Sequence, residues 1–171
     1  MKRSNLLLTC VALAVVVVAA LAGPARAGES LPFKGSLEGT LVSRTPVAPP
    51  VVHDVFDITG HATQLGQFEL VIEATVDFCA RPVTGEGTAT FTAANGDTLV
   101  ADITGSSVLV APGIVLITEH ATIDPDRSTG RFAGATGTFT LERFADAATG
   151  VTGVTVGSFE GTISLATPIN R

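Results

Sequence analysis

The chain has 171 residues, a net charge of −6, nine Phe, and neither Trp nor Tyr. Without Trp and Tyr it lacks the usual stacking platforms for sugars and bases, and its acidic balance repels phosphate backbones and anionic lipid. Composition and charge therefore disfavour nucleic-acid binding and membrane-surface binding as functions.

The first 27 residues have the pattern of a secretory signal peptide. A basic start precedes an apolar run over residues 6–21, and Ala25-Arg26-Ala27 places small residues where a signal peptidase reads them. We expect cleavage after Ala27, with an uncleaved anchor as the alternative. Cleavage would leave one domain over residues 28–171, and the mature protein would be secreted or periplasmic. It would contain seven Lys and Arg and 16 Asp and Glu, so its net charge would be −9. No membrane association is expected after cleavage, and Cys79, the single cysteine then left, rules out an internal disulfide.

Alternation of apolar and polar residues dominates from residue 33 onward and predicts β-strands, each with one buried face. Ser43–His53 interrupts this alternation with three prolines and is predicted to be a loop or an edge crossing, because proline cannot donate to a ladder. Asn95-Gly96 predicts a hairpin with a type I′ turn. In chain order, strands are expected at residues 33–41, 54–63, 67–78, 85–93, 97–105, 113–123, 136–144 and 153–165.

Repeated phrases relate several of these strands to one another. Ile58–Thr63 reads almost as Ile117–Thr122 does, and Glu-Gly-Thr begins at positions 38, 86 and 160. The first and last strands share such a phrase, which predicts that Phe33–Leu41 pairs antiparallel with Ser158–Leu165 and removes both sheet edges. The predicted fold class is all-β, a single-domain eight-stranded antiparallel up-and-down β-barrel, with a β-sandwich as the alternative.

The segment Ser128–Thr138 contains a Gly-rich turn, a Phe and a run of small residues that ends in Gly before a strand. In this it resembles the turn-and-strand signature of the allene oxide cyclase and dirigent barrels. The resemblance implies an eight-stranded barrel with an interior cavity, in proteins that are often oligomeric, so a homo-oligomer stays open. It also implies apolar, oxygenated small molecules as ligands or substrates. The matching residues are structural, and no catalytic residue of those families can be placed on this chain.

Two charged residues occupy inward positions of predicted strands. Glu119 alternates in phase with Ile117 and Ala121, and Arg143 alternates in phase with Phe139 and Leu141. An unpaired buried charge costs several kcal/mol, so we expect the two side chains to meet each other or to reach water at a barrel end. Glu119 and Arg143 are the candidate ligand-binding residues, Glu119 is the candidate catalytic residue, and a structural ion pair is the alternative.

The other inward and polar features favour structural roles. Six glycines share the inward phase and either allow tight coiling or leave room for a ligand. His61 and His120 are predicted to point outward, and Asp124 and Asp126 to form a plain turn, so no metal site is expected. No cofactor is expected, because the usual motifs for phosphate binding, redox-active cysteines and nucleophilic serine are missing. The inward glycines are Gly35, Gly39, Gly60, Gly87, Gly157 and Gly161.

Three functions remain open at this point. The first is a barrel that binds a small apolar ligand among Phe and Gly residues, without catalysis, with Glu119 and Arg143 near the polar end of the ligand. The second is a cyclase or isomerase that uses Glu119 as its acid or base. The third is a structural or surface-interaction domain with a filled core. The volume of the interior separates the third from the other two, and the polar groups that face Glu119 separate the first two.

Overall fold

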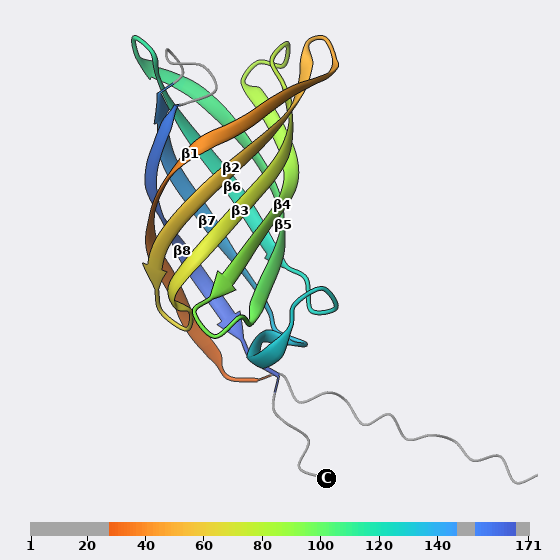
Figure 1. Cartoon of the computed structure of the whole chain (residues 1–171), viewed down its shortest axis with the longest axis vertical. Helices are drawn as coiled ribbons and strands as arrows, with labels where there is room; N and C mark the ends of the chain where they lie inside the picture. Colours follow the sequence, from red (N-terminus) through yellow and green to blue (C-terminus); the bar gives the residue numbers. More distant parts are fainter. Residues whose placement is uncertain (1–27, 147–152, 167–171) are drawn as a thin grey trace, which may run out of the picture.

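The structure is a computed structural model and describes residues 28–146 and 153–166. Its strands are all antiparallel and close into a barrel in which each strand pairs with its neighbours in sequence (Figure 1). The predicted all-β, single-domain, up-and-down barrel is therefore confirmed, whereas the predicted signal peptide lies outside the described residues. The elements are β1 (Ser30–Ala48), β2 (Val51–Ala62), β3 (Gly66–Asp77), β4 (Val83–Ala93), β5 (Thr98–Ala111), β6 (Ile114–Ile123), the 3₁₀ helix η1 (Gly130–Phe132), β7 (Thr136–Asp146) and β8 (Val154–Ser164).

The barrel closes through β1 and β8, as the shared phrase predicts. Phe33 lies opposite Gly161, and the ladder runs from the Ser30–Ser164 pair to the Thr40–Val154 pair. Closure leaves neither strand with an open edge along this stretch, which removes the liability to pair with another chain there. The β-sandwich alternative is excluded.

Of the two predictions for Ser43–His53, a loop or an edge crossing, the loop is wrong. β1 continues to Ala48 and β2 begins at Val51, so that these residues form the two strands of a hairpin, with register shifts after Leu41 and after Pro46. Pro49 and Pro50 lie in the turn between the two strands, and Pro46 is tolerated in β1 because β1 pairs with β8 only as far as Thr40. Beyond that point β1 pairs, among the described residues, with β2 alone, and a strand with one free edge can accept a residue that cannot donate on that side.

Asn95 and Gly96 lie in a hairpin connection, as predicted, but the predicted type I′ turn is wrong. Gly96 has a φ of 86°, whereas Asn95 is not among the residues with positive φ. The Gly96 N–H donates to the Ala93 carbonyl at 2.8 Å, which makes a tight turn followed by a left-handed glycine. The Asn95 side chain bonds Asp97 instead, and it thereby stabilises the turn without a second positive φ.

Phenylalanine fills the lower part of the barrel, as the molecule is drawn in Figure 1. The cluster consists of five rings from five strands, and eight pairs of these rings have centroids 4.9 to 6.1 Å apart, mostly edge to face. Such pairs stabilise the core beyond the area they bury. This part of the interior is therefore packed with side chains. The rings belong to Phe33, Phe68, Phe91, Phe139 and Phe159.

The six inward glycines allow neighbouring strands to approach closely. At every one of them an added Cβ would overlap a backbone carbonyl oxygen of the adjacent strand, as at Gly161 against Thr138. A side chain at these positions would push the strands apart, so the glycines permit the tight coiling of a narrow barrel. These contacts favour tight coiling over the alternative that the glycines leave room for a ligand.

The segment Ser128–Thr138, which carries the family resemblance, covers the lower end of the barrel (Figure 1). Phe132 of η1 is fully buried in the core, and Gly130 and Gly134 have φ values of 59° and 74°. The Ser128 hydroxyl donates to the Asp124 carbonyl and accepts from the Val100 N–H, which fixes the loop to β5. Glycine is required here for positive φ and Phe for packing, as the sequence indicates.

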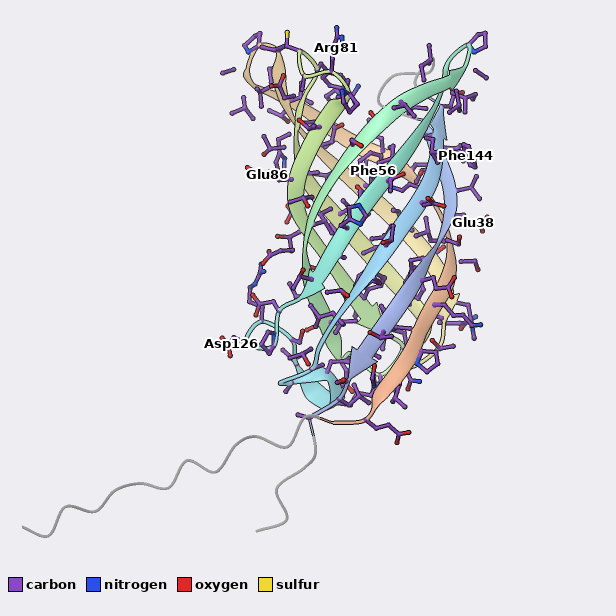
Figure 2. The ribbon with its side chains drawn as sticks, turned by 180° about the vertical axis from the view of Figure 1, so that it is seen from behind. Glu38, Phe56, Arg81, Glu86, Asp126 and Phe144 are labelled. Carbon is purple, nitrogen blue, oxygen red and sulfur yellow. The ribbon has the colours of Figure 1, made fainter. Side chains whose placement is uncertain are left out.

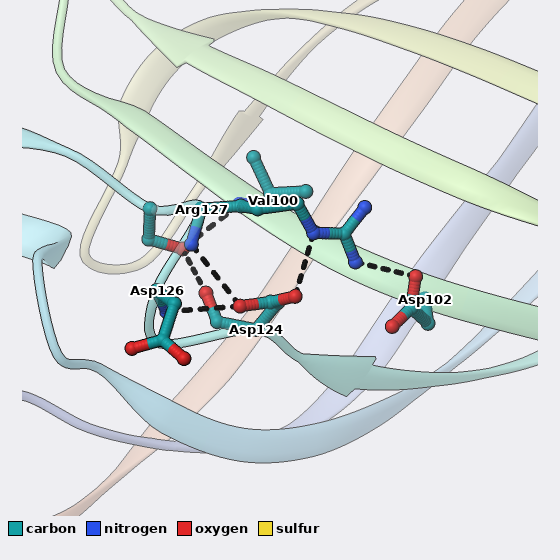
Figure 3. Close-up of polar contacts among 6 residues, drawn as sticks. Val100, Asp102, Asp124, Asp126 and Arg127 are labelled. Atoms are coloured by element: carbon teal, nitrogen blue, oxygen red, sulfur yellow. Dashed lines mark hydrogen bonds and ion pairs between the residues drawn. The ribbon is translucent and has the colours of Figure 1, made fainter.

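Asp124 and Arg127 organise the loop before η1 (Figure 3). One carboxylate oxygen of Asp124 accepts from the N–H groups of Asp126 and Arg127, and the other accepts from Arg127 Nε at 2.6 Å. Arg127 also bonds Asp102 on β5. These contacts form a side-chain-stabilised turn. They lower the pKa of Asp124, chiefly through the side-chain hydrogen bond from Arg127.

Because the pKa of Asp124 is lowered, the contribution of this loop to the stability of the fold depends on pH in the acid range. A carboxyl whose pKa is lower in the folded chain stabilises the fold above its unfolded pKa of about 4 and loses that contribution as pH falls through the folded value. Asp124→Asn keeps an oxygen for the two backbone N–H groups but removes the charge. The difference in urea midpoint between wild type and variant is expected to narrow from pH 7 to pH 2.5. A difference independent of pH would contradict this assignment.

The outer wall carries mainly Thr and charged residues, and Figure 2 shows Glu38 and Glu86 projecting outward from opposite sides. One apolar row departs from this pattern near the upper end. Val108, Leu116, Phe144 and Val156 lie directly opposite one another across β5 to β8. Phe144 is 49% exposed.

Within residues 28–146 and 153–166, no helix is long and apolar enough to cross a membrane.

Candidate functional site

The upper half of the barrel encloses a cavity of about 130 Å³. Its apolar walls come from residues on β1 to β7, among them Leu41, Phe56, Val76, Ile103 and Ile117. An apolar cavity of about 150 Å³ in another protein holds a benzene molecule, so this volume suits a compact ligand and not a drug-sized one. The interior is therefore filled by Phe rings below and hollow above.

Glu119 and Arg143 meet at the wall of this cavity. Arg143 Nε donates to Glu119 Oε2 at 2.9 Å, and Arg143 Nη2 donates to Glu119 Oε1 at 2.8 Å. The pair is bidentate, and the side chains of Arg143 and Glu119 are only 2% and 7% exposed. The expectation that these inward charges pair is confirmed, and the pair is buried and not at a wet rim.

Further contacts fix the Arg143 guanidinium. Nη1 donates to the Thr155 hydroxyl at 3.4 Å, and that hydroxyl donates in turn to the Phe144 carbonyl. The Phe56 ring centroid lies 4.2 Å from Arg143 Cζ, within the range of a cation–π contact. Because Thr155, Phe56 and Glu119 hold it on three sides, the guanidinium has little freedom to turn.

A second bidentate pair lines the same cavity. Arg44 of β1 donates through Nε and Nη2 to the two carboxylate oxygens of Asp54 on β2, each at 2.7 Å. The Asp54 side chain is buried, whereas that of Arg44 is 35% exposed and lies 5.1 Å from the Phe78 ring centroid. The hydrogen bonds that Arg44 donates to Asp54 raise the pKa of Arg44 above its usual value. Two guanidinium–carboxylate pairs therefore supply most of the charge around an apolar space.

Sequence reasoning missed the Arg44–Asp54 pair because both residues lie in or next to the segment predicted to be a loop. A signal was present nonetheless. Asp54 alternates in phase with Phe56 and Ile58, which are buried. An inward carboxylate in this phase predicts a basic partner on a neighbouring strand, by the same reasoning that paired Glu119 with Arg143.

The remaining residues singled out in the sequence lie away from this cavity. His61 and His120 are exposed on the outer wall, as predicted, and His120 bonds the Thr140 hydroxyl. Cys79 is exposed after β3, and its N–H donates to Asp77 Oδ1. The described residues contain no group of three or more His, Cys, Asp or Glu placed to hold a metal ion.

Fold and cavity define the class of this protein: a small closed antiparallel β-barrel, packed at one end and hollow at the other. Comparison with protein-family models, with curated proteins and with solved structures gave no match to the chain. The barrel expected from the allene oxide cyclase and dirigent resemblance is present.

Proposed function

We propose that this chain is an exported β-barrel that binds a small, largely apolar molecule in its upper cavity without catalysis. The observation that carries the proposal is a cavity of about 130 Å³ with apolar walls and a few buried polar groups, the usual composition of a small-molecule site. Export is supported by the signal-peptide pattern of residues 1–27. The proposed ligand contacts Phe56 and aliphatic side chains, with its polar end near Glu119 and Arg143.

The geometry of Glu119 favours binding over acid–base chemistry. Both of its carboxylate oxygens accept hydrogen bonds from the Arg143 guanidinium. A general base must reach the proton it abstracts, and a carboxylate clamped on both oxygens is poorly placed to do so. The cyclase or isomerase alternative would need Glu119 to leave Arg143 first.

Filling the cavity provides the test. Gly85 lines the cavity, and a Cβ there would find its nearest atom, the Thr75 carbonyl oxygen, at 3.3 Å. Gly85→Leu should therefore place a side chain in the space, with a shift of a few tenths of an ångström between the new Cβ and the Thr75 carbonyl. Titration of benzene into the purified exported protein, followed by amide chemical shifts, is expected to shift residues around the cavity in wild type. Gly85→Leu is expected to abolish these shifts.

The matched control is the neighbouring residue on β4. Glu86 projects outward (Figure 2), so Glu86→Leu adds the same side chain outside the barrel and should leave benzene binding unchanged. Wild-type protein that shows no benzene-dependent shifts, or equal loss of binding in both variants, would contradict the proposed function.

A further inference from the structure

We propose that the ligand of the upper cavity is uncharged, and that Arg143, not Glu119, contacts it by donating to an acceptor oxygen such as that of a ketone, ester or alcohol. The inference rests on the proposed function and adds the charge and polar group of the ligand. It also assigns separate roles to the two members of the buried pair. Arg143 contacts the ligand, and Glu119 positions Arg143.

The expected absence of charge on the ligand follows from how the charged side chains around the cavity are paired. Each of the two guanidiniums, Arg143 and Arg44, is paired in bidentate fashion with its own carboxylate, Glu119 or Asp54. An anionic ligand beside Arg143 would also lie beside Glu119, with no unmatched positive charge to offset its desolvation. A cationic ligand would find both carboxylates occupied, and Asp146, the third carboxylate at the cavity, is itself engaged.

The acceptor oxygen expected on the ligand follows from a count of the N–H donors of Arg143. A guanidinium has five N–H groups, and Arg143 uses two on Glu119 and one on the Thr155 hydroxyl. Every buried side-chain nitrogen of the described residues has a partner, but Nη1 and Nη2 each carry a second N–H for which residues 28–146 and 153–166 show no acceptor. Arg143 lines the cavity and is 2% exposed, so these donors have little access to bulk water. A neutral ligand oxygen can accept from them without adding a charge to the site.

The size of the cavity restricts the ligand further. About 130 Å³ with apolar walls accommodates a single ring or a short branched chain that carries one polar group. Phe56 is already stacked against Arg143, so the polar group and the apolar wall meet at one place. The class of ligand is therefore a compact neutral molecule with an acceptor oxygen at one end.

Four six-membered-ring probes that differ only in their polar group test the proposal: cyclohexanone, cyclohexane, cyclohexanecarboxylate and cyclohexylammonium. Affinities are measured at pH 7 by chemical-shift titration of the exported protein. Cyclohexanone is expected to bind at least about tenfold more tightly than either charged probe, because each charged probe loses its hydration with no unmatched charge in the cavity to offset the loss. Tighter binding of the carboxylate or of the ammonium would overturn the inference.

A double variant tests the role of Arg143. Glu119→Leu with Arg143→Met removes the pair without leaving a buried charge unpaired, an exchange that buried pairs commonly tolerate. The preference for cyclohexanone over cyclohexane is expected to fall about tenfold from wild type to this variant. Using the ratio of the two affinities cancels the different hydration of the probes. An unchanged ratio would show that Arg143 does not contact the ligand.

The outcomes separate this inference from the proposed function. If a charged probe binds in the cavity as well as cyclohexanone does, or if the ratio of the cyclohexanone and cyclohexane affinities is the same in wild type and in the double variant, the cavity is a binding site and the inference about charge and acceptor fails. If neither benzene nor any of the four probes shifts the cavity residues, the proposed function fails and the inference fails with it. A double variant that does not fold is replaced by Glu119→Met with Arg143→Leu, which likewise has no donor at position 143 and is read in the same way.

Discussion

Replacing Arg143 with methionine is expected to lower the free energy of unfolding by about 3–5 kcal/mol. The variant leaves the Glu119 carboxylate buried without its two donors, and a buried unpaired charge is among the most destabilising changes known for a single residue. The loss of the Phe56 contact adds to the effect. Urea denaturation at pH 7 measures it.

Two comparisons make this result interpretable. The double variant Glu119→Leu with Arg143→Met should recover most of the stability, because it removes both charges together. Arg127→Met breaks two exposed ion pairs, with Asp102 and with Asp124, in which the Arg127 side chain is 44% exposed, and should cost no more than about 1 kcal/mol per pair. If Arg143→Met costs no more than Arg127→Met, the Glu119–Arg143 pair is solvated and the site described above is wrong.

Phe33→Ala is the second change with a large expected effect, again about 3–5 kcal/mol. Phe33 is fully buried, and its ring lies within 4.9 to 6.1 Å of the Phe91, Phe139 and Phe159 centroids. Truncation removes the apolar contact area and opens a void that rings on neighbouring strands cannot fill without leaving their rotamers. Thermal and urea denaturation measure the loss.

Phe144→Ala is the matched control, because it is the same change on the outer wall. Phe144 is 49% exposed, and its truncation should cost less than about 1 kcal/mol. If the two substitutions cost the same, the Phe cluster would not be the core that holds the lower half of the barrel together.

Alternation along the strands was sufficient to predict the fold, because the period of two is a local property of the chain. It predicted eight strands and the inward direction of Glu119 and Arg143, and the repeated Glu-Gly-Thr phrase predicted that the first strand pairs with the last. Local rules failed where the outcome depended on neighbours. The alternation pattern predicts a loop or an edge crossing at Pro46, whereas Pro46 lies in β1. Nothing in the local sequence shows that β1 beyond Leu41 pairs, among the described strands, with β2 alone.

The sequence by itself determined the class of fold, the closure and the two inward charges of β6 and β7, since each follows from the side on which successive residues fall. Only the tertiary structure decided that five Phe rings pack one end and leave the other end hollow, because packing depends on which residues of different strands share a level. It also decided that Arg44 and Asp54 join Glu119 and Arg143 around one cavity. The register of four strands sets that arrangement, and no single segment of the chain contains it.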